Sequence, residues 1–170
     1  AVAPGGLGAR RRAQFLTWLY LRTPGALWLT TRILARYPRL IRDSLDANLA
    51  AGKRTPDFDE IVALATEEAR AKAAHHEPAI DDWMALAYGP FAMRLDLLPD
   101  LPRLTVPTLW VRGERDELVG AAEMIAAAQA APGSHLATIP GAGHIVTYDE
   151  PDELTRLVRE FLERDSAEHG

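Results

Sequence analysis

The sequence contains no cysteine, and this absence excludes disulfides, thiolate nucleophiles and cysteine-ligated metal sites. Because a cysteine-free chain fits a reducing compartment, we expect a cytoplasmic protein. No stretch approaches the roughly 18–20 consecutive apolar residues of a membrane-spanning helix, so we expect no membrane association. The net charge of −5 disfavours a nucleic-acid-binding surface. The one basic run, Arg10–Arg12, is typical of the solvated start of a helix.

Metal and nucleotide motifs are also absent, and we expect neither a metal nor a cofactor. His75 and His76 are the only adjacent pair of metal-ligating side chains that merits attention. Both follow a predicted helix, on which adjacent side chains diverge by about 100°. Asp81 or Asp82 would have to converge on them to complete a metal site.

What is present is the composition of a folded protein, with 48% apolar and 25% charged residues among 170. From about Gln14 to Tyr88 the apolar spacing predicts several short helices and no strand. Thr23-Pro24 and Thr55-Pro56 resemble a helix N-cap followed by a proline, so we expect helices to begin there. The proline-punctuated stretch 97–107 is predicted to be a connection.

The C-terminal half has a different pattern, in which strands alternate with helices. The predicted order is strand 105–111, helix 121–131, strand 135–139 and helix 151–164. A strand, a crossover helix and a second strand of these lengths predict a parallel pair. Two parallel strands rarely form a stable sheet alone, so we expect the edge of a larger sheet, with one edge of the strand 105–111 unpaired.

A carboxylate and an imidazole follow these two strands. Asp116 lies in RGERDELV after the first strand, and His144 lies in GAGH after the second. Because α/β sheets place their sites at the carboxyl ends of the strands, we expect the two side chains to meet. An aspartate hydrogen-bonded to a histidine is the orienting half of a nucleophilic triad.

No serine of the chain has the setting of a nucleophile that would complete such a triad. Ser44 lies within a predicted helix, Ser134 lies in a Pro-Gly turn, and Ser166 lies in the C-terminal tail. A serine nucleophile of this kind normally sits on a sharp turn between a strand and a helix, in the pattern G-x-S-x-G.

In this context Asp116 and His144 resemble the acid and base of the α/β-hydrolase superfamily, and the resemblance covers nearly the whole chain. PGGLG at Pro4–Gly8 is similar to the segment after the sixth strand in hydrolases of meta-cleavage products of aromatic rings. Leu104–Gly113 resembles the seventh strand, Gly141–Glu150 the eighth strand with its histidine loop, and Pro151–Arg164 the final helix.

The resemblance implies an α/β fold class: the C-terminal part of an α/β-hydrolase fold, with a parallel sheet edge, flanking helices and an all-helical cap. Residues 1–8 would be the end of a core strand and its turn, residues 9–92 the cap, and residues 93–170 the C-terminal part of the core.

The resemblance also implies a hydrolase of a small apolar ester or a related acyl or carbon–carbon substrate. His144 would take the proton of the nucleophile, and Asp116 would hold the imidazole in the required tautomer. In the family the nucleophile elbow and the oxyanion-hole loop precede the cap. We therefore expect them upstream of Ala1, in an N-terminal half encoded by the same gene or a second chain, and expect this chain alone to be inactive.

Leu118, Val119 and Ile145 are predicted to form an apolar wall beside the substrate. Two positions depart from the aromatic-ring branch of the family, because Ile145 stands where tryptophan is usual and Gly120 where proline is common. The tryptophans of the helical region either line a substrate pocket or form the core of the helical layer. They are Trp18, Trp28 and Trp83.

Two further functions remain open at this point. The same acid and histidine serve dehalogenases and epoxide hydrolases, in which the nucleophile is an aspartate, and cofactor-free oxygenases. A ligand-binding module that has kept the scaffold without catalysis is the other alternative.

Overall fold

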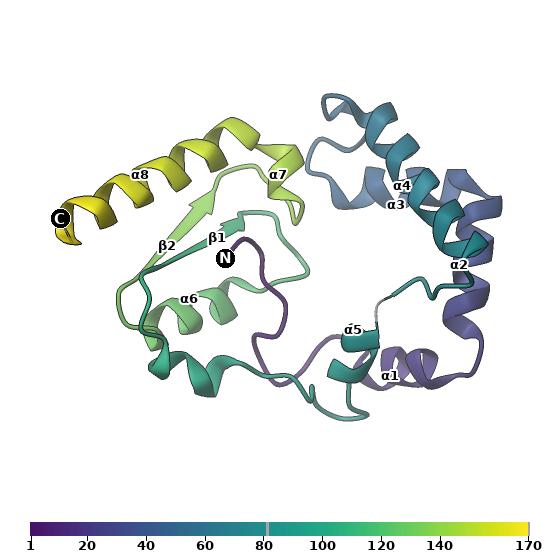
Figure 1. The fold of residues 1–170 in the computed structure, drawn as a ribbon, viewed down its shortest axis with the longest axis horizontal. Coiled ribbons are helices and arrows are strands. Elements are labelled where there is room, and N and C mark those ends of the chain that lie inside the picture. The colour runs from purple at the N-terminus through teal and green to yellow at the C-terminus, as the bar shows by residue number, and fades with distance from the viewer. Residues whose placement is uncertain (81, 170) are drawn as a thin grey trace. The chain divides into compact units, whose positions relative to one another are not determined.

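Two units make up the chain (Figure 1). Each unit has buried residues of its own. The computed structural model describes residues 1–80 and 82–169. The first unit comprises Ala1–Leu7, Asn48–Thr55 and Leu97–Gly170, and the second comprises Gly8–Ala47 and Pro56–Asp96. The segment 48–55, which lies inside the range predicted for a cap, thus packs with the sheet-bearing unit. The assignment of 9–92 as a cap stays a prediction.

The first unit is built on a parallel strand pair, as the sequence predicts. Strand β1 (Thr108–Gly113) runs beside β2 (Ser134–Ile139), in a register that places Thr108 opposite Ser134. Helix α6 (Ala121–Ala130) is the crossover between them. The carboxyl ends of both strands therefore lie at the same edge of the sheet.

The edge of the first strand that we expected to be unpaired is paired at Val111 by the first residues of the chain. Val2 forms a parallel bridge with Val111. The Ala3 N–H donates to the Val111 carbonyl, and the Val111 N–H donates to the Ala1 carbonyl, both at 2.8 Å. Strand β1 is therefore hydrogen-bonded along both sides at Val111.

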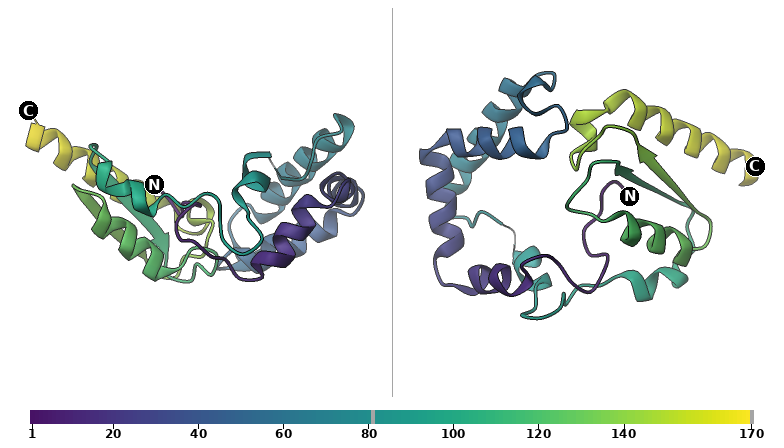
Figure 2. Two further views of the ribbon diagram at one scale, coloured as in Figure 1. Left: turned by 90° about the horizontal axis from the view of Figure 1, so that it is seen from below. Right: turned by 180° about the vertical axis from the view of Figure 1, so that it is seen from behind.

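Alternate residues of β1 face two separate cores. Trp110 belongs to a cluster that includes Met124 and Ala127 of α6, both with no exposed surface. Leu109 and Val111 belong to a second cluster, which packs against helix α8 (Pro151–His169). The two helices consequently cover opposite faces of the strand pair, as Figure 2 shows.

Three short helical elements were not predicted. The stretch expected to be a plain connection contains the 3₁₀ helix η2 (Leu98–Arg103), in which two prolines are tolerated. A single-turn helix, α7 (Val146–Asp149), links the loop after β2 to α8. A second 3₁₀ turn, η1 (Gly52–Arg54), lies in the 48–55 segment.

The second unit is helical, as predicted. Its helices are α1 (Gln14–Arg22), α2 (Ala26–Arg36), α3 (Pro38–Asn48, whose last residue belongs to the first unit), α4 (Phe58–Ala74) and α5 (Asp82–Ala87). The predicted helix starts at Pro24 and Pro56 are two residues early. In the described part of the chain, no helix has both the length and the apolar character needed to cross a bilayer.

Candidate catalytic site

Asp116 lies on the turn that follows β1, and its carboxylate is fully buried. Its Oδ1 accepts the backbone N–H groups of Leu118, at 2.8 Å, and Val119, at 3.0 Å. These bonds close the turn on its own side chain, as aspartate commonly does in loops. The second oxygen, Oδ2, is left for another partner.

That partner is His144, on the loop that follows β2. Its Nδ1 lies 3.0 Å from Oδ2 of Asp116, and its side chain is one-third exposed. Because an ionised carboxylate only accepts hydrogen bonds, this contact places the proton on Nδ1 and leaves the Nε2 lone pair to accept a proton. The described residues offer Nε2 no hydrogen-bond partner.

Backbone hydrogen bonds hold the two loops together. The Glu114 N–H donates to the Ile139 carbonyl and the Arg115 N–H to the Ala142 carbonyl, both at 2.9 Å. Gly113, the last residue of β1, has no room for a side chain, since a Cβ there would lie 2.1 Å from the Gly143 carbonyl oxygen. The acid and the histidine thus meet because their loops touch through the backbone.

The buried side chain of Arg112 binds the backbone of the turn that carries Asp116. Its side chain is buried, and Nη2 donates to the carbonyls of Asp116, at 3.2 Å, and Glu114, at 3.3 Å. Its Nε is buried and has no hydrogen-bond partner among the described residues. The role of Arg112 was not predicted, because an arginine in a strand gives no sign in the sequence that it is buried.

Comparison with known proteins assigns the chain to a family. A family model described as the alpha/beta hydrolase family matches residues 1–157. The chain belongs to this family. The strand-end acid and histidine lie where the resemblance places the alpha/beta hydrolase acid and base, and their catalytic role is a proposal.

Among curated proteins, a pimeloyl-[acyl-carrier protein] methyl ester esterase of Xanthomonas oryzae pv. oryzae (strain MAFF 311018) is 41% identical over 69 residues. That match covers 41% of this chain and 27% of the esterase. The chain thus aligns with about a quarter of this relative's length.

Among solved structures, a thermophilic esterase from Thermogutta terrifontis is 26% identical, with a TM-score of 0.54 over 84% of this chain and 51% of the esterase. The 2-hydroxy-6-oxo-6-phenylhexa-2,4-dienoate hydrolase from Rhodococcus sp. strain RHA1 shares the fold, with 18% identity and a TM-score of 0.59. That match covers 95% of this chain and 53% of the hydrolase.

The three residues predicted to contact substrate occupy different environments in this alpha/beta hydrolase. Leu118 is exposed and Ile145 is half-buried. Val119 packs in the core beside Trp110 and Met124. Their contact with substrate stays a prediction.

The serines lie away from any strand-to-helix turn, as expected. Ser44 is in α3, Ser166 is in α8, and Ser134 begins β2, where its hydroxyl accepts the indole N–H of Trp110 at 3.0 Å.

A metal site is not found among the described residues, and Asp81, one of the two carboxylates considered for it, lies outside them. The tryptophans of the helical unit occupy different settings. Trp83 is exposed, Trp28 lies under the Arg32 guanidinium, and Trp18 packs beside Phe15.

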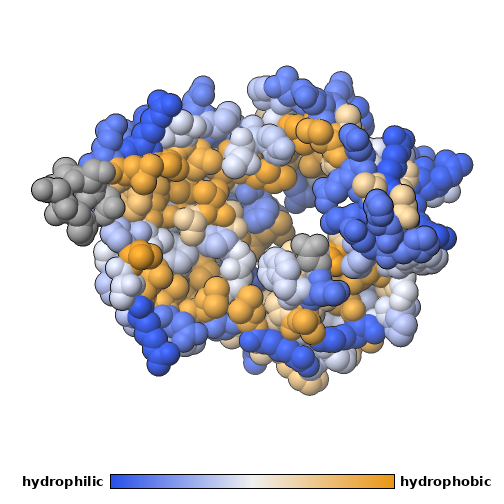
Figure 3. All heavy atoms as spheres, viewed as in Figure 1, coloured by the Kyte–Doolittle hydropathy of each residue, from blue (hydrophilic) through white to orange (hydrophobic). Residues whose placement is uncertain are grey.

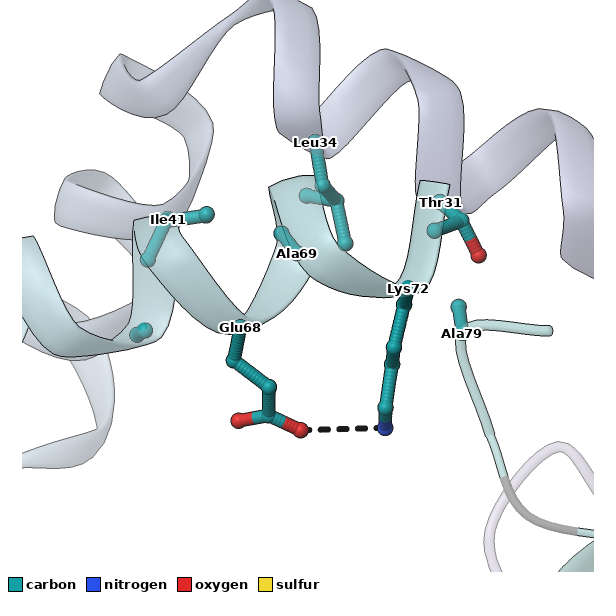
Figure 4. Close-up of a pocket in the computed structure, with 8 residues that line it drawn as sticks. Thr31, Leu34, Ile41, Glu68, Ala69, Lys72 and Ala79 are labelled. Carbon is teal, nitrogen blue, oxygen red and sulfur yellow. Dashed lines mark ion pairs between the residues drawn. The ribbon is translucent and has the colours of Figure 1, made fainter. Parts of the chain in front are cut away.

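A cavity of about 170 Å³ lies within the helical unit (Figure 4). Its walls are mostly apolar, and the ion pair of Glu68 with Lys72, at 3.0 Å, lines one side. None of the three tryptophans lines it. The lining residues are Thr31, Leu34, Ile41, Ala65, Glu68, Ala69, Lys72 and Ala79.

Proposed function

We propose that this chain supplies the base and the acid of a nucleophile–histidine–aspartate triad that hydrolyses a small apolar ester. The hydrogen bond between His144 and Asp116, at the carboxyl ends of neighbouring parallel strands, carries the proposal. The identity of 41% to an esterase segment, and the likeness to a second esterase, support ester chemistry over the wider range of the family.

Each residue has a defined task in this mechanism. Nε2 of His144 takes the proton of the nucleophile's hydroxyl as that oxygen attacks the ester carbonyl. His144 then returns the proton to the departing alcohol, and it activates a water molecule that releases the acid product. Asp116 holds the tautomer and stabilises the imidazolium formed in both steps.

The nucleophile and the oxyanion hole are proposed to come from the rest of the hydrolase core, on the same gene product or on a second chain. Figure 3 shows apolar side chains gathered over the unit that carries the sheet. Val2, Leu136 and Leu162 are among the large apolar side chains that this unit leaves exposed. Apolar surface of this kind supports packing against further protein.

The test begins with the coding sequence around this chain, which is expected to hold a G-x-S-x-G elbow. The complete gene product should hydrolyse p-nitrophenyl butyrate, and the isolated 170-residue chain should not. His144→Ala should lower kcat by about 10³-fold or more, because the triad acts as a unit. His75→Ala is the matched control, since His75 is an exposed histidine of the helical unit.

Two other outcomes of these experiments would indicate a different function. An aspartate at the elbow, with turnover of an alkyl halide or epoxide and not of esters, would replace the serine chemistry. Ligand binding without turnover, unchanged in His144→Ala, would indicate a binding module.

A further inference from the structure

Asp149 is a half-buried carboxylate that the proposed triad does not use. It is the last residue of the single-turn helix α7, five positions after His144 in the chain. Its two oxygens accept hydrogen bonds from two backbone groups, one close in sequence and one remote. Oδ2 accepts the Gly143 N–H and Oδ1 accepts the Ala50 N–H, both at 2.8 Å.

These two donors connect the histidine loop to a segment remote in sequence. Gly143 is the residue directly before His144, and Ala50 lies in the connection between α3 and α4. The approach at Gly143 is close, because a Cβ there would lie 3.1 Å from both the Asn48 carbonyl oxygen and Oδ2 of Asp149. The backbone before the histidine is therefore clamped between Asp149 and the 48–50 segment.

Only a carboxylate meets both demands of this position. An asparagine has one accepting oxygen, and its NH₂ group would face the second N–H as donor against donor. Charge-assisted bonds from a carboxylate to backbone N–H groups are also stronger than neutral ones. Two contacts therefore hold this loop: Asp116 binds the ring of His144, and Asp149 binds the backbone N–H of the preceding residue, Gly143.

We propose that Asp149 is a positioning residue for His144, and that it fixes the imidazole against Asp116 by tying the histidine loop to the α3–α4 connection. This inference rests on the function proposed above for His144. Its structural consequence, the orientation of the ring, is measurable without turnover.

The first experiment uses NMR on the ¹⁵N-labelled complete gene product. The proton bound to Nδ1 of His144 is expected to give a hydrogen-bonded resonance, assigned by its loss in His144→Gln. Asp149→Asn should weaken or abolish this resonance and raise the amide exchange rates of Gly143 and Ala50 by about tenfold or more. Glu150→Gln, which removes the same charge one residue later from an exposed side chain, should leave the resonance and both rates unchanged.

A second variant perturbs the same contact at Gly143 instead of at Asp149. Gly143→Ala places a methyl group against the Asn48 carbonyl and the Asp149 carboxylate, and it should weaken the same resonance. If the resonance persists in both variants, and Asp149→Asn lowers only the melting temperature, the role of Asp149 is structural and the proposal is overturned.

In the complete gene product, Asp149→Asn should lower kcat for the ester by roughly 10–100-fold while KM stays within about threefold, because a displaced base reacts poorly with bound substrate. An unchanged kcat would also overturn the proposal. If the unmodified gene product shows no ester turnover, the proposed function fails, and the Nδ1 resonance still decides the role of Asp149.

Discussion

Asp116 divides its two carboxylate oxygens between two tasks. Oδ1 holds the N–H groups of Leu118 and Val119, and Oδ2 faces Nδ1 of His144. The side chain therefore builds its own turn while it orients the histidine. Substitution separates the two tasks only partly, because any replacement also changes what the turn can bind.

For Asp116→Asn, we expect kcat of the complete gene product to fall by about 10³–10⁴-fold. The amide can keep its oxygen on the two backbone donors, but its NH₂ then faces Nδ1 and favours the wrong imidazole tautomer. Steady-state kinetics measures the effect. Glu117→Gln is the control, since it neutralises the adjacent, exposed acid and should leave kcat unchanged.

Arg112 gives the second prediction at this scale. Arg112→Met removes the donor to the buried Asp116 carbonyl, and we expect a loss of about 1–3 kcal/mol in the free energy of unfolding. The second acceptor of Arg112, the Glu114 carbonyl, belongs to an exposed residue. Urea denaturation compares this variant with Arg115→Met, whose exposed side chain should cost little; equal losses would contradict the role given to Arg112.

At the scale of elements, the loops after β1 and β2 can make contact because Gly113 has no side chain. Gly113→Ala would place its Cβ 2.1 Å from the Gly143 carbonyl oxygen and 2.4 Å from that of Ala142. Because backbone atoms on both sides must move, the histidine loop would be displaced from the acid.

We expect Gly113→Ala to lower the free energy of unfolding by about 1–3 kcal/mol or more, and to weaken the Asp116–His144 bond. Chemical denaturation measures the first effect and the Nδ1 proton resonance the second. Gly120→Ala is the matched control: its Cβ would meet only the Glu123 side chain, no closer than 3.6 Å. Equal effects of the two changes would rule out the steric argument.

The helix starts show where local sequence signals mislead. Helix α2 begins after Gly25, at φ 77°, and α4 begins after Asp57, at φ 56°. In both places the preceding threonine ends the earlier helical segment. The Thr23 N–H donates to the Tyr20 carbonyl, and the Thr55 N–H donates to the Gly52 carbonyl. Each threonine ends one element and so does not cap the next.

At the scale of the whole molecule, the division into two units predicts that a core substitution in one unit destabilises that unit and not the other. Met124 lies in the core of the first unit and Phe58 is buried in the second. Truncation of either side chain leaves a cavity that costs about 2–5 kcal/mol.

Met124→Ala is expected to speed hydrogen exchange in peptides of the first unit, including 48–55, and to leave α2 and α4 unchanged. Phe58→Ala should do the reverse. Exchange followed by mass spectrometry tests both variants together. A uniform rise across the chain in either variant would mean that the units unfold as one.

The sequence by itself determined the helical unit, the parallel pair and the acid–histidine candidates. These depend on local patterns: apolar spacing at helical period, β-branched runs bounded by glycine turns, and polar residues directly after strands. The alpha/beta hydrolase resemblance rests on short local motifs of the same kind, those around Asp116 and His144 among them.

Only the tertiary structure decided what lies beside these residues. The pairing of Val2 with β1, the burial of Arg112 and the two bonds of Asp149 all join groups through backbone or side-chain contacts that no local pattern records. Asp149 and Ala50 are 99 positions apart. Their contact depends on how the chain closes on itself, because hydrogen bonds between remote groups form only where packing brings them within reach.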